Sequence, residues 1–222
     1  MALHDQMTFD ELNRLVGYKR SEDFEDYFRP MRITEEQKRQ RIRLAEAFQN
    51  EFIYAMSLMF YTKPDMNAVN EIRDRYIRCL ESLGIGVAIA TSLADREQML
   101  RMQAEKFAID IVAATKRHED DPYFFSEDRA RLMSEDQANF IGDMSDYADA
   151  IESGMRFKTW QTVGDNRVRD SHEEVEGMTI PIGEAFVLQG GMLLHPHDDS
   201  LGCSDDELCG CRCSLSFSAT EE

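Results

Sequence analysis

The spacing of the apolar residues changes near Gly154, and this change divides the chain into two kinds of structure. Before Gly154, apolar residues recur every three or four positions, which is the period of an α-helix with one buried face. After Gly154, segments such as "MRFKTWQTV" and "AFVLQGGMLLHP" alternate apolar and polar residues, as short strands do. The sequence therefore predicts an α+β chain, with a mostly helical N-terminal region followed by a small C-terminal α+β module that has a short antiparallel sheet.

Four helices with short connections are predicted before Gly154, and they favour a bundle. The first follows a capping box at Thr34 and Gln37 and ends before Pro64; the second begins at Asp65 and ends near Gly84. The third lies within residues 84–121, and the fourth runs from Ser126 to Gly154. The residues expected on their buried faces include Ile42, Ala45, Phe48, Phe52, Met56, Met59, Val69, Ile72, Tyr76, Cys79 or Leu80, Leu83, Leu93, Met99 or Leu100, Phe107, Ile111 and Val112.

These patterns divide the chain into three parts. Residues 1–117 form a helical region suited to partner binding, residues 118–154 form connecting helices, and residues 155–222 form the C-terminal module. In this module, strands are expected around Trp160, on both sides of Gly190 and Gly191, and in "CRCSLSF". The module has few large apolar residues, and so short a segment builds only a small core. A cross-link would therefore add to its stability.

Charge is distributed unevenly along the chain, whose formal net charge is −18. Residues 1–117 contain 19 acidic and 18 basic side chains, whereas residues 118–222 contain 24 acidic and 7 basic ones. Direct DNA binding is therefore unfavourable for the acidic C-terminal half, and a basic or metal-bearing partner suits it better. The alternative interpretation is that this acidity only keeps the protein in solution and reflects no partner. Neither a membrane-spanning stretch nor a signal peptide is recognisable, so we expect no membrane association and a reducing cytoplasm as the place of synthesis.

Four of the five cysteines lie in "GCSDDELCGCRC", at Cys203, Cys209, Cys211 and Cys213. Together with His172, His195 and His197 they provide candidate ligands for a structural zinc, and His172 with the four cysteines is the predicted set. The Cys-x-Cys spacing differs from the paired Cys-x2–4-Cys of strong zinc signatures, so reduced structural thiols are an equal alternative. An odd number of cysteines and a reducing compartment disfavour disulfides.

The same residues also suggest a catalytic alternative. Cys211 or Cys213 with His172 and Asp165 has the chemical types of a thiol nucleophile, a base and an orienting acid. None of the recognised catalytic or nucleotide-binding motifs follows a strand in this sequence, however. We therefore predict no catalytic residue, no cofactor-binding residue and no enzyme activity.

A spaced set of residues in the C-terminal part resembles a known family. Trp160 is followed by Asp165-x-Arg167-x-Arg169-x-x-His172, Gly177 and Phe186, then by the turn Pro196–Asp198 and by Cys211-Arg212-Cys213. This order and spacing are similar to the C-terminal domain of phage head-morphogenesis proteins, the Mu F-like minor head protein family. The resemblance covers residues 129–215, and residues 1–117 match no family.

The structural motif residues have expected roles beside this resemblance. Trp160 is expected in the core, and Asp165 is expected to cap a short helix that Gly177 ends. Arg167 and Arg169 either reach carboxylates in the acidic loop after His197 or remain solvated, and Arg212 faces solvent or a carboxylate.

The resemblance implies a minor capsid component that associates with the portal and/or the major capsid protein. It also implies a place in the procapsid interior and the virion, synthesis in the bacterial host cytoplasm, and a role in head morphogenesis, DNA packaging or ejection. Two alternatives remain at this point. One is an enzyme or toxin module using His172 and the cysteines, and the other is a zinc-stapled adaptor outside phage.

Overall fold

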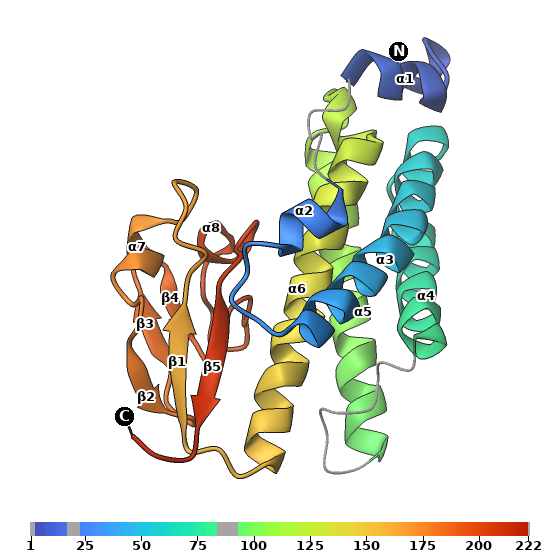
Figure 1. Cartoon of the computed structure of the whole chain (residues 1–222). Coiled ribbons are helices and arrows are strands. Elements are labelled where there is room, and N and C mark those ends of the chain that lie inside the picture. The colour runs from blue at the N-terminus through green and yellow to red at the C-terminus, as the bar shows by residue number, and fades with distance from the viewer. Residues whose placement is uncertain (1–2, 17–22, 84–92, 222) are drawn as a thin grey trace. The chain divides into compact units, whose positions relative to one another are not determined.

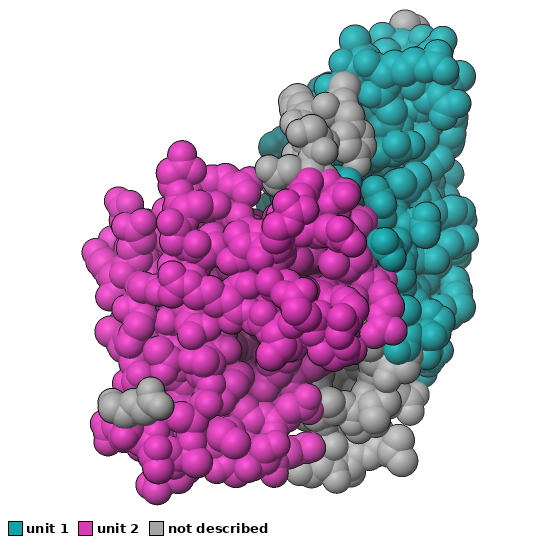
Figure 2. All heavy atoms as spheres, viewed as in Figure 1, with its two compact units in different colours: residues 1–21, 44–134 teal, residues 22–43, 135–222 magenta. Residues whose placement is uncertain are grey.

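The computed structural model describes residues 3–16, 23–83 and 93–221. The chain forms two compact units: residues 1–21 with 44–134, and residues 22–43 with 135–222 (Figure 2). The helices are α1 (Phe9–Val16), α2 (Phe24–Phe28), α3 (Glu35–Tyr61), α4 (Met66–Ser82), α5 (Leu93–Arg117) and α6 (Glu127–Glu152), with short 3-10 turns at Leu3–Asp5 and Pro122–Phe125 (Figure 1). A helical N-terminal part followed by short antiparallel sheets confirms the predicted α+β class. The division at residues 117 and 154 stays a prediction.

The helix boundaries follow from local capping. The Thr34 N–H donates to the Gln37 side chain at 2.8 Å, and the Gln37 N–H donates to the Thr34 hydroxyl at 3.3 Å, which confirms the capping box. Asp65 accepts from the backbone of Asn67 and Ala68 before α4, and Ser126 accepts from the Arg129 N–H at 3.2 Å at the start of α6. After α6, Gly154 has φ 74°, as a glycine ending a helix often does.

The core of the first unit is built from aromatic rings. Phe48 of α3 lies 4.9 Å from Tyr76 of α4, and Tyr76 lies 5.0 Å from Phe107 of α5, measured between ring centroids. These contacts pack three helices around one cluster. Most of the predicted faces are buried, while Ile42, Leu83 and Phe107 are half-buried. Gly84 and the side chains of Leu93, Met99 and Leu100 lie outside the described residues.

The second unit contains two small antiparallel sheets. Strands β1 (Phe157–Gln161), β2 (Thr179–Pro181) and β5 (Ser214–Ser218) pair in the order β2-β1-β5, and β3 (Phe186–Leu188) forms a hairpin with β4 (Gly191–Leu193). The strands at β1, β3, β4 and β5 were predicted. Strand β2 and the short helix α8 (Asp205–Leu208) were not, and α7 (Asp170–Glu173) is the expected short helix.

Trp160 of β1 lies at the centre of the second unit and is fully buried, as predicted. The cluster around it consists of Val175, Phe186, Leu188, Leu193, Cys203, Cys211 and Cys213. Gly191 is required in the hairpin because its φ is 138° and a Cβ there would lie 2.9 Å from the Cys203 Cα. The segment that carries Cys203, Cys211 and Cys213 is thus part of the hydrophobic core of this unit.

A buried network of charges links three segments of the second unit. Arg41 of α3 is fully buried, and its Nη2 lies 2.8 Å from both Asp143 Oδ1 and Asp146 Oδ2 of α6. His197, in the loop after β4, lies with Nδ1 2.9 Å from Asp143 Oδ2. Gly142 makes room for this arrangement, since a Cβ there would lie 2.5 Å from the guanidinium carbon of Arg41. The network therefore joins segments that are far apart in the sequence.

Arg41→Ala should strongly destabilise the second unit, because it leaves His197 as the one cation, among the described residues, beside the two carboxylates of Asp143 and Asp146. We expect a loss of about 3–5 kcal/mol, typical of breaking a buried ion pair. The control is Arg39→Ala on the same helix, whose exposed pair with Glu36 at 2.7 Å should contribute at most about 1 kcal/mol. Urea unfolding followed by the fluorescence of Trp160, the one tryptophan of the chain, measures both. If the two substitutions lower the free energy of unfolding equally, Arg41 does not form a stabilising buried ion pair.

The His197–Asp143 pair should make stability depend on pH. Burial alone would lower the pKa of His197, but its hydrogen bond to Asp143 and the charges of Asp143, Cys211 and Asp136 raise that pKa to about 9. Because this exceeds the value of about 6.5 in an unfolded chain, the contribution is fully present below about pH 6.5 and is lost as the pH rises through about 9.

The comparison variant is His197→Asn, since His197 has φ 65° and asparagine tolerates this backbone region. The difference in unfolding free energy between the two proteins should shrink from pH 6.5 to 9. Lys158, whose pKa burial lowers to about 8, titrates in both proteins and cancels in the difference. A difference that stays constant over this range would refute the pairing.

Candidate metal centre

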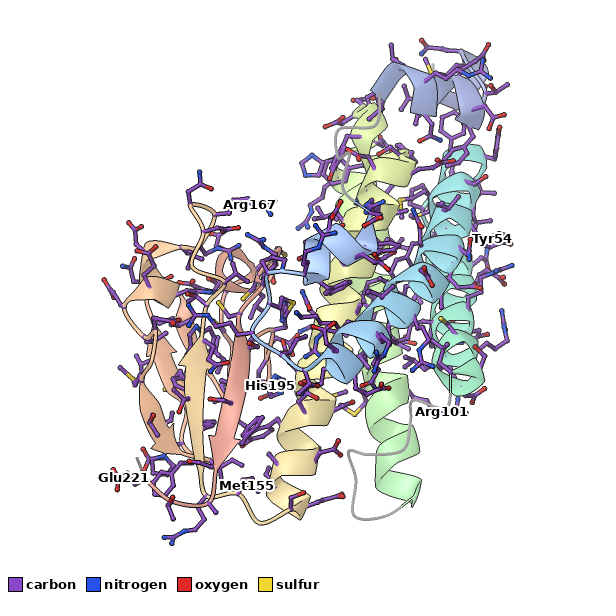
Figure 3. The ribbon with its side chains drawn as sticks, viewed as in Figure 1. Tyr54, Arg101, Met155, Arg167, His195 and Glu221 are labelled. Atoms are coloured by element: carbon purple, nitrogen blue, oxygen red, sulfur yellow. The ribbon has the colours of Figure 1, made fainter. Side chains whose placement is uncertain are left out.

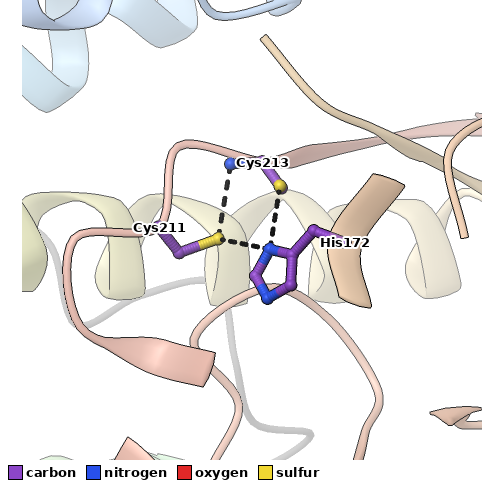
Figure 4. Close-up of side chains that lie close together, drawn as sticks. All are labelled: His172, Cys211 and Cys213. Atoms are coloured by element: carbon purple, nitrogen blue, oxygen red, sulfur yellow. Dashed lines mark hydrogen bonds between the residues drawn. The ribbon is translucent and has the colours of Figure 1, made fainter. Parts of the chain in front are cut away.

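Three of the predicted ligands meet in the core of the second unit. His172 lies on α7, and Cys211 and Cys213 lie just before β5. His172 Nδ1 is 3.3 Å from the Cys213 Sγ and 3.6 Å from the Cys211 Sγ, and the three side chains point toward one another (Figure 4). All three residues are buried, at 2–3% exposure.

Two side chains of α6 hold the cysteine segment in place. Asp136 accepts from the Gly210 N–H at 2.8 Å, and Asn139 donates to the Cys211 carbonyl at 3.2 Å. Gly210 has φ 69°, so the chain turns sharply directly before Cys211. The Cys213 N–H then donates to the Cys211 Sγ at 3.4 Å, which brings both sulfurs to one side of the segment.

Glu207 of α8 orients the histidine ring from its other side. Its Oε2 lies 3.1 Å from His172 Nε2 and accepts from the Ser171 hydroxyl at 2.7 Å, while its Oε1 accepts from the Gly190 N–H at 2.9 Å. Burial raises the pKa of Glu207, but these hydrogen bonds and His172 outweigh it, so the pKa is lowered and the carboxylate is charged. A carboxylate at Nε2 places the ring proton there and leaves the Nδ1 lone pair facing the sulfurs.

The two thiols are electrostatically different. A hydrogen bond from the Cys213 thiol lowers the pKa of Cys211 well below its usual value against the effect of burial, and the charge of His197 acts in the same direction. The same hydrogen bond, together with burial, raises the pKa of Cys213. The pair therefore favours one thiolate at Cys211, which is the charge state that binds metal ions.

These distances match those of a tetrahedral zinc site. Zinc bonds of about 2.3 Å to sulfur and 2.0–2.1 Å to nitrogen place neighbouring sulfur and nitrogen ligands about 3.5 Å apart. The observed separations of 3.3 and 3.6 Å fall on either side of this value, and all three ligand atoms lie within 4.8 Å of one another. The buried His172, Cys211 and Cys213 group could hold a metal, and it is the only group of this kind among the described residues.

The other candidate ligands lie outside this group. Cys203 is buried in the same core cluster, and Cys209 is exposed. His195 Nδ1 lies 2.9 Å from the Pro196 carbonyl, and His197 pairs with Asp143.

The structural motif residues surround the centre. Trp160 packs edge-on against His172 at 5.5 Å, and its carbonyl accepts from the N–H of Gly177, which has φ 73°. Both carboxylate oxygens of Asp165 accept from Arg212 Nη2, at 2.6 and 2.8 Å. Arg212 is buried, with 6% of its surface exposed, and faces a carboxylate as one of its two expected partners.

Two expectations about this motif need correction. Asp165 accepts from the Arg167 N–H at 3.0 Å within a turn and does not cap α7, whose N-cap residue is Arg169. Arg169 donates to the Cys209 carbonyl, so it reaches a backbone group and not a carboxylate. Arg167 lies on an exposed loop, with its Nε 3.7 Å from Asp165 Oδ2, and the expectation for its side chain stays a prediction (Figure 3).

Sequence reasoning missed Glu207, Asp136 and Asn139. Glu207 is one of three consecutive acidic residues, and no local pattern distinguishes the buried one from its exposed neighbours. Asp136 and Asn139 are three residues apart on one helix face, which is the spacing of a surface stripe as well as of a binding surface.

The fold and the centre define a class of protein: an α+β chain in which a small antiparallel sheet covers a buried histidine and cysteine cluster. The family model described as Phage Mu protein F like protein matches residues 70–216, more than half of the chain. The chain therefore belongs to the Phage Mu F-like family, whose head proteins are generally structural and not catalytic. No curated protein and no solved structure matched the chain.

The family match begins earlier than the sequence resemblance. It starts at residue 70, within α4, whereas the resemblance was expected to start at residue 129. Most of α4 and all of α5 thus belong to the matched region, which corrects the expectation that residues 1–117 match no family. Membership of this family indicates a protein of phage head morphogenesis.

Proposed function

We propose that this protein is a minor structural component of a phage or prophage head, with the portal and/or the major capsid protein as partners. The observation that carries this proposal is the family match over residues 70–216, which contains the whole histidine and cysteine centre. In this role the protein is made in the bacterial host cytoplasm and becomes part of the procapsid interior and the virion. No described helix is long and apolar enough to cross a membrane.

Burial argues against the catalytic alternative. Cys213, His172 and Glu207 form a chain of contacts with the parts of a nucleophile, a base and an orienting acid. The sulfur and the imidazole are 97–98% shielded from solvent, however, so a substrate carbonyl has no route to the sulfur in this conformation. The burial of all three side chains therefore favours a structural role over a catalytic one.

We further propose that the centre holds a structural zinc. His172, Cys211 and Cys213 would be ligands, and Cys203 or Cys209 would be the fourth. When bound, the metal would link α7 to the segment before β5 and so connect two parts of a small core. Glu207 would then keep His172 in the tautomer and orientation that metal binding needs.

The full-length protein should purify with about one equivalent of zinc by elemental analysis. A chelator should lower the urea midpoint of the second unit, followed by Trp160 fluorescence, because zinc in small domains stabilises folding by up to about 10–16 kcal/mol. His172→Ala and Cys213→Ser should abolish both the zinc content and the effect of the chelator.

The matched control is Cys79→Ser, a buried thiol of α4 in the first unit, which should leave zinc content unchanged. Comparing Cys203→Ser with Cys209→Ser identifies the fourth ligand, since one of the two should lose zinc. If the purified protein contains no zinc and the chelator leaves its unfolding unchanged, the three side chains are joined by hydrogen bonds alone, each contributing about 1 kcal/mol.

Head assembly itself tests the main proposal. Deleting the gene from an inducible phage or prophage that encodes it should lower the yield of infectious particles, and mass spectrometry should find the protein in purified wild-type particles. Arg41→Ala should fail to restore the yield, whereas Arg39→Ala should restore it, because only the first breaks a buried pair. Full yield without the gene, or absence of the protein from particles, would overturn the proposal.

We propose that the helices of residues 1–117 make the partner contact, supported by their balanced charge and by exposed apolar side chains such as Met66 and Met102. Met66→Lys with Met102→Lys should then reduce incorporation into procapsids. Val187→Lys with Met192→Lys, at equally exposed apolar positions of the second unit, is the matched control. A larger loss with the control pair would assign the contact to the second unit.

A further inference from the structure

A groove of about 770 Å³ lies beside β5 in the second unit. One wall is formed by Leu215, Ser216 and Phe217 of β5, and the other by the start of α3 and the end of α6. Met155, which follows α6, also lines it (Figure 3). This volume lies within the range of roughly 300–1,000 Å³ that is typical of ligand-binding sites.

The groove exposes the free edge of a sheet. The Trp160 N–H donates to the Met178 carbonyl at 3.1 Å, so Trp160 turns its backbone polar groups away from β5. Leu215, paired with Trp160 across the two strands, must then turn its own N–H and C=O away from β1, and Phe217 does the same two residues later. Three consecutive residues of β5 line the groove although alternate side chains face opposite sides of a sheet, which also indicates the edge.

The β5 edge lacks the proline and the charged side chains that commonly protect an edge strand against pairing. Natural edge strands are commonly short or carry proline or lysine. Strand β2, at the other edge of the sheet, has three residues and ends in Pro181, whereas the five residues of β5 are SLSFS, without charge or proline. The edge that lies in the groove is therefore the one able to accept another strand.

The groove carries a small excess of negative charge. Three of its charged lining residues are ion-paired, Arg32 with Glu176, Glu36 with Arg39 and Asp146 with Arg41, which leaves Asp149 as the carboxylate that a ligand would meet. Asp149 is exposed, and burial together with the charges of Asp146 and Glu152 raises its pKa, so negative charge is concentrated there. A second copy of this chain would bring its own net charge of −18 to the same place, which disfavours self-pairing.

We propose that this groove binds an extended, basic segment of a partner protein, which pairs with β5 as an added strand. Backbone hydrogen bonds to Leu215 and Phe217 would supply affinity, and Asp149 together with the net negative charge of residues 118–222 would favour lysine or arginine side chains. The inference rests on the groove alone and is independent of whether the partner is a phage head protein.

Binding can be tested on the full-length protein with acetylated octapeptides that carry lysine at alternate positions and a mixture of residues between them. The amides of Leu215 and Phe217 should become slower in hydrogen exchange when the peptides are added. Peptides N-methylated at alternate residues, on the edge that would pair with β5, should bind about thirtyfold more weakly, because two hydrogen bonds of about 1 kcal/mol each are lost. Peptides with glutamate in place of lysine should show no binding.

Two variants of the protein separate backbone pairing from charge. Asp149→Lys should weaken binding about three- to fivefold, as expected for one charge at the rim of a site, whereas Glu184→Lys, exposed outside the groove, should not. Phe217→Pro removes one edge N–H and should abolish amide protection at Leu215, with Trp160 fluorescence confirming that the unit is folded.

Three results would overturn the proposal. Equal binding of normal and N-methylated peptides would show attraction by charge without strand addition. Unchanged exchange of the Leu215 and Phe217 amides at millimolar peptide would show that the edge is not a binding site. A dimer that disappears with Phe217→Pro would assign the edge to a second copy of this chain.

Discussion

The second unit depends on the buried charge of Arg41. Removing a guanidinium from water costs several kcal/mol, and only close carboxylates with good geometry offset this cost. Asp143 and Asp146 provide this compensation, while Nε and Nη1 of Arg41 have no hydrogen-bond partner among the described residues. Because His197 shares Asp143, displacing any one of the three segments that carry these side chains leaves a buried charge uncompensated. The network thus fixes α3, α6 and the loop after β4 relative to each other within this unit.

The same face of α6 also positions the candidate metal centre. Asp136, Asn139, Asp143 and Asp146 recur every three or four residues, which places them on one stripe of the helix. The first two bind the segment of Gly210 and Cys211, and the last two bind Arg41. One polar stripe therefore organises both the charge network and the cysteines. A centre built in this way needs residues from α6 as well as from the small sheet.

Sequence patterns predicted features with local causes. The Thr34 capping box, the hairpin around Gly190 and the burial of Trp160 follow from short-range chemistry or from hydrophobicity, and the structure confirms them. The two turn residues are Gln189 and Gly190, because Gly191 is in β4 and pairs with Leu188. The burial of Asn139 and Asp143 in the polar stripe of α6 was not predicted, because a polar face with helical spacing usually faces solvent. Strand β2 has three residues and α8 has four, lengths at which tertiary contacts outweigh local preference. The meeting of His172 with Cys211 and Cys213 was expected from residue types, but the exposure of Cys209 depends on a turn that spacing does not reveal.

The few basic residues of the C-terminal half are largely used inside the fold. Lys158 is buried and donates to the Leu194 carbonyl at 2.6 Å, Arg212 binds Asp165, and Arg169 binds the Cys209 carbonyl. Of 24 acidic residues after position 117, only a few, such as Asp143 and Glu207, are buried with partners. The fold therefore directs its cations inward and leaves its negative charge at the surface. A nucleic acid would be repelled by such a surface, whereas a basic protein segment would be attracted to it, and strand pairing would give that general attraction a defined position along β5.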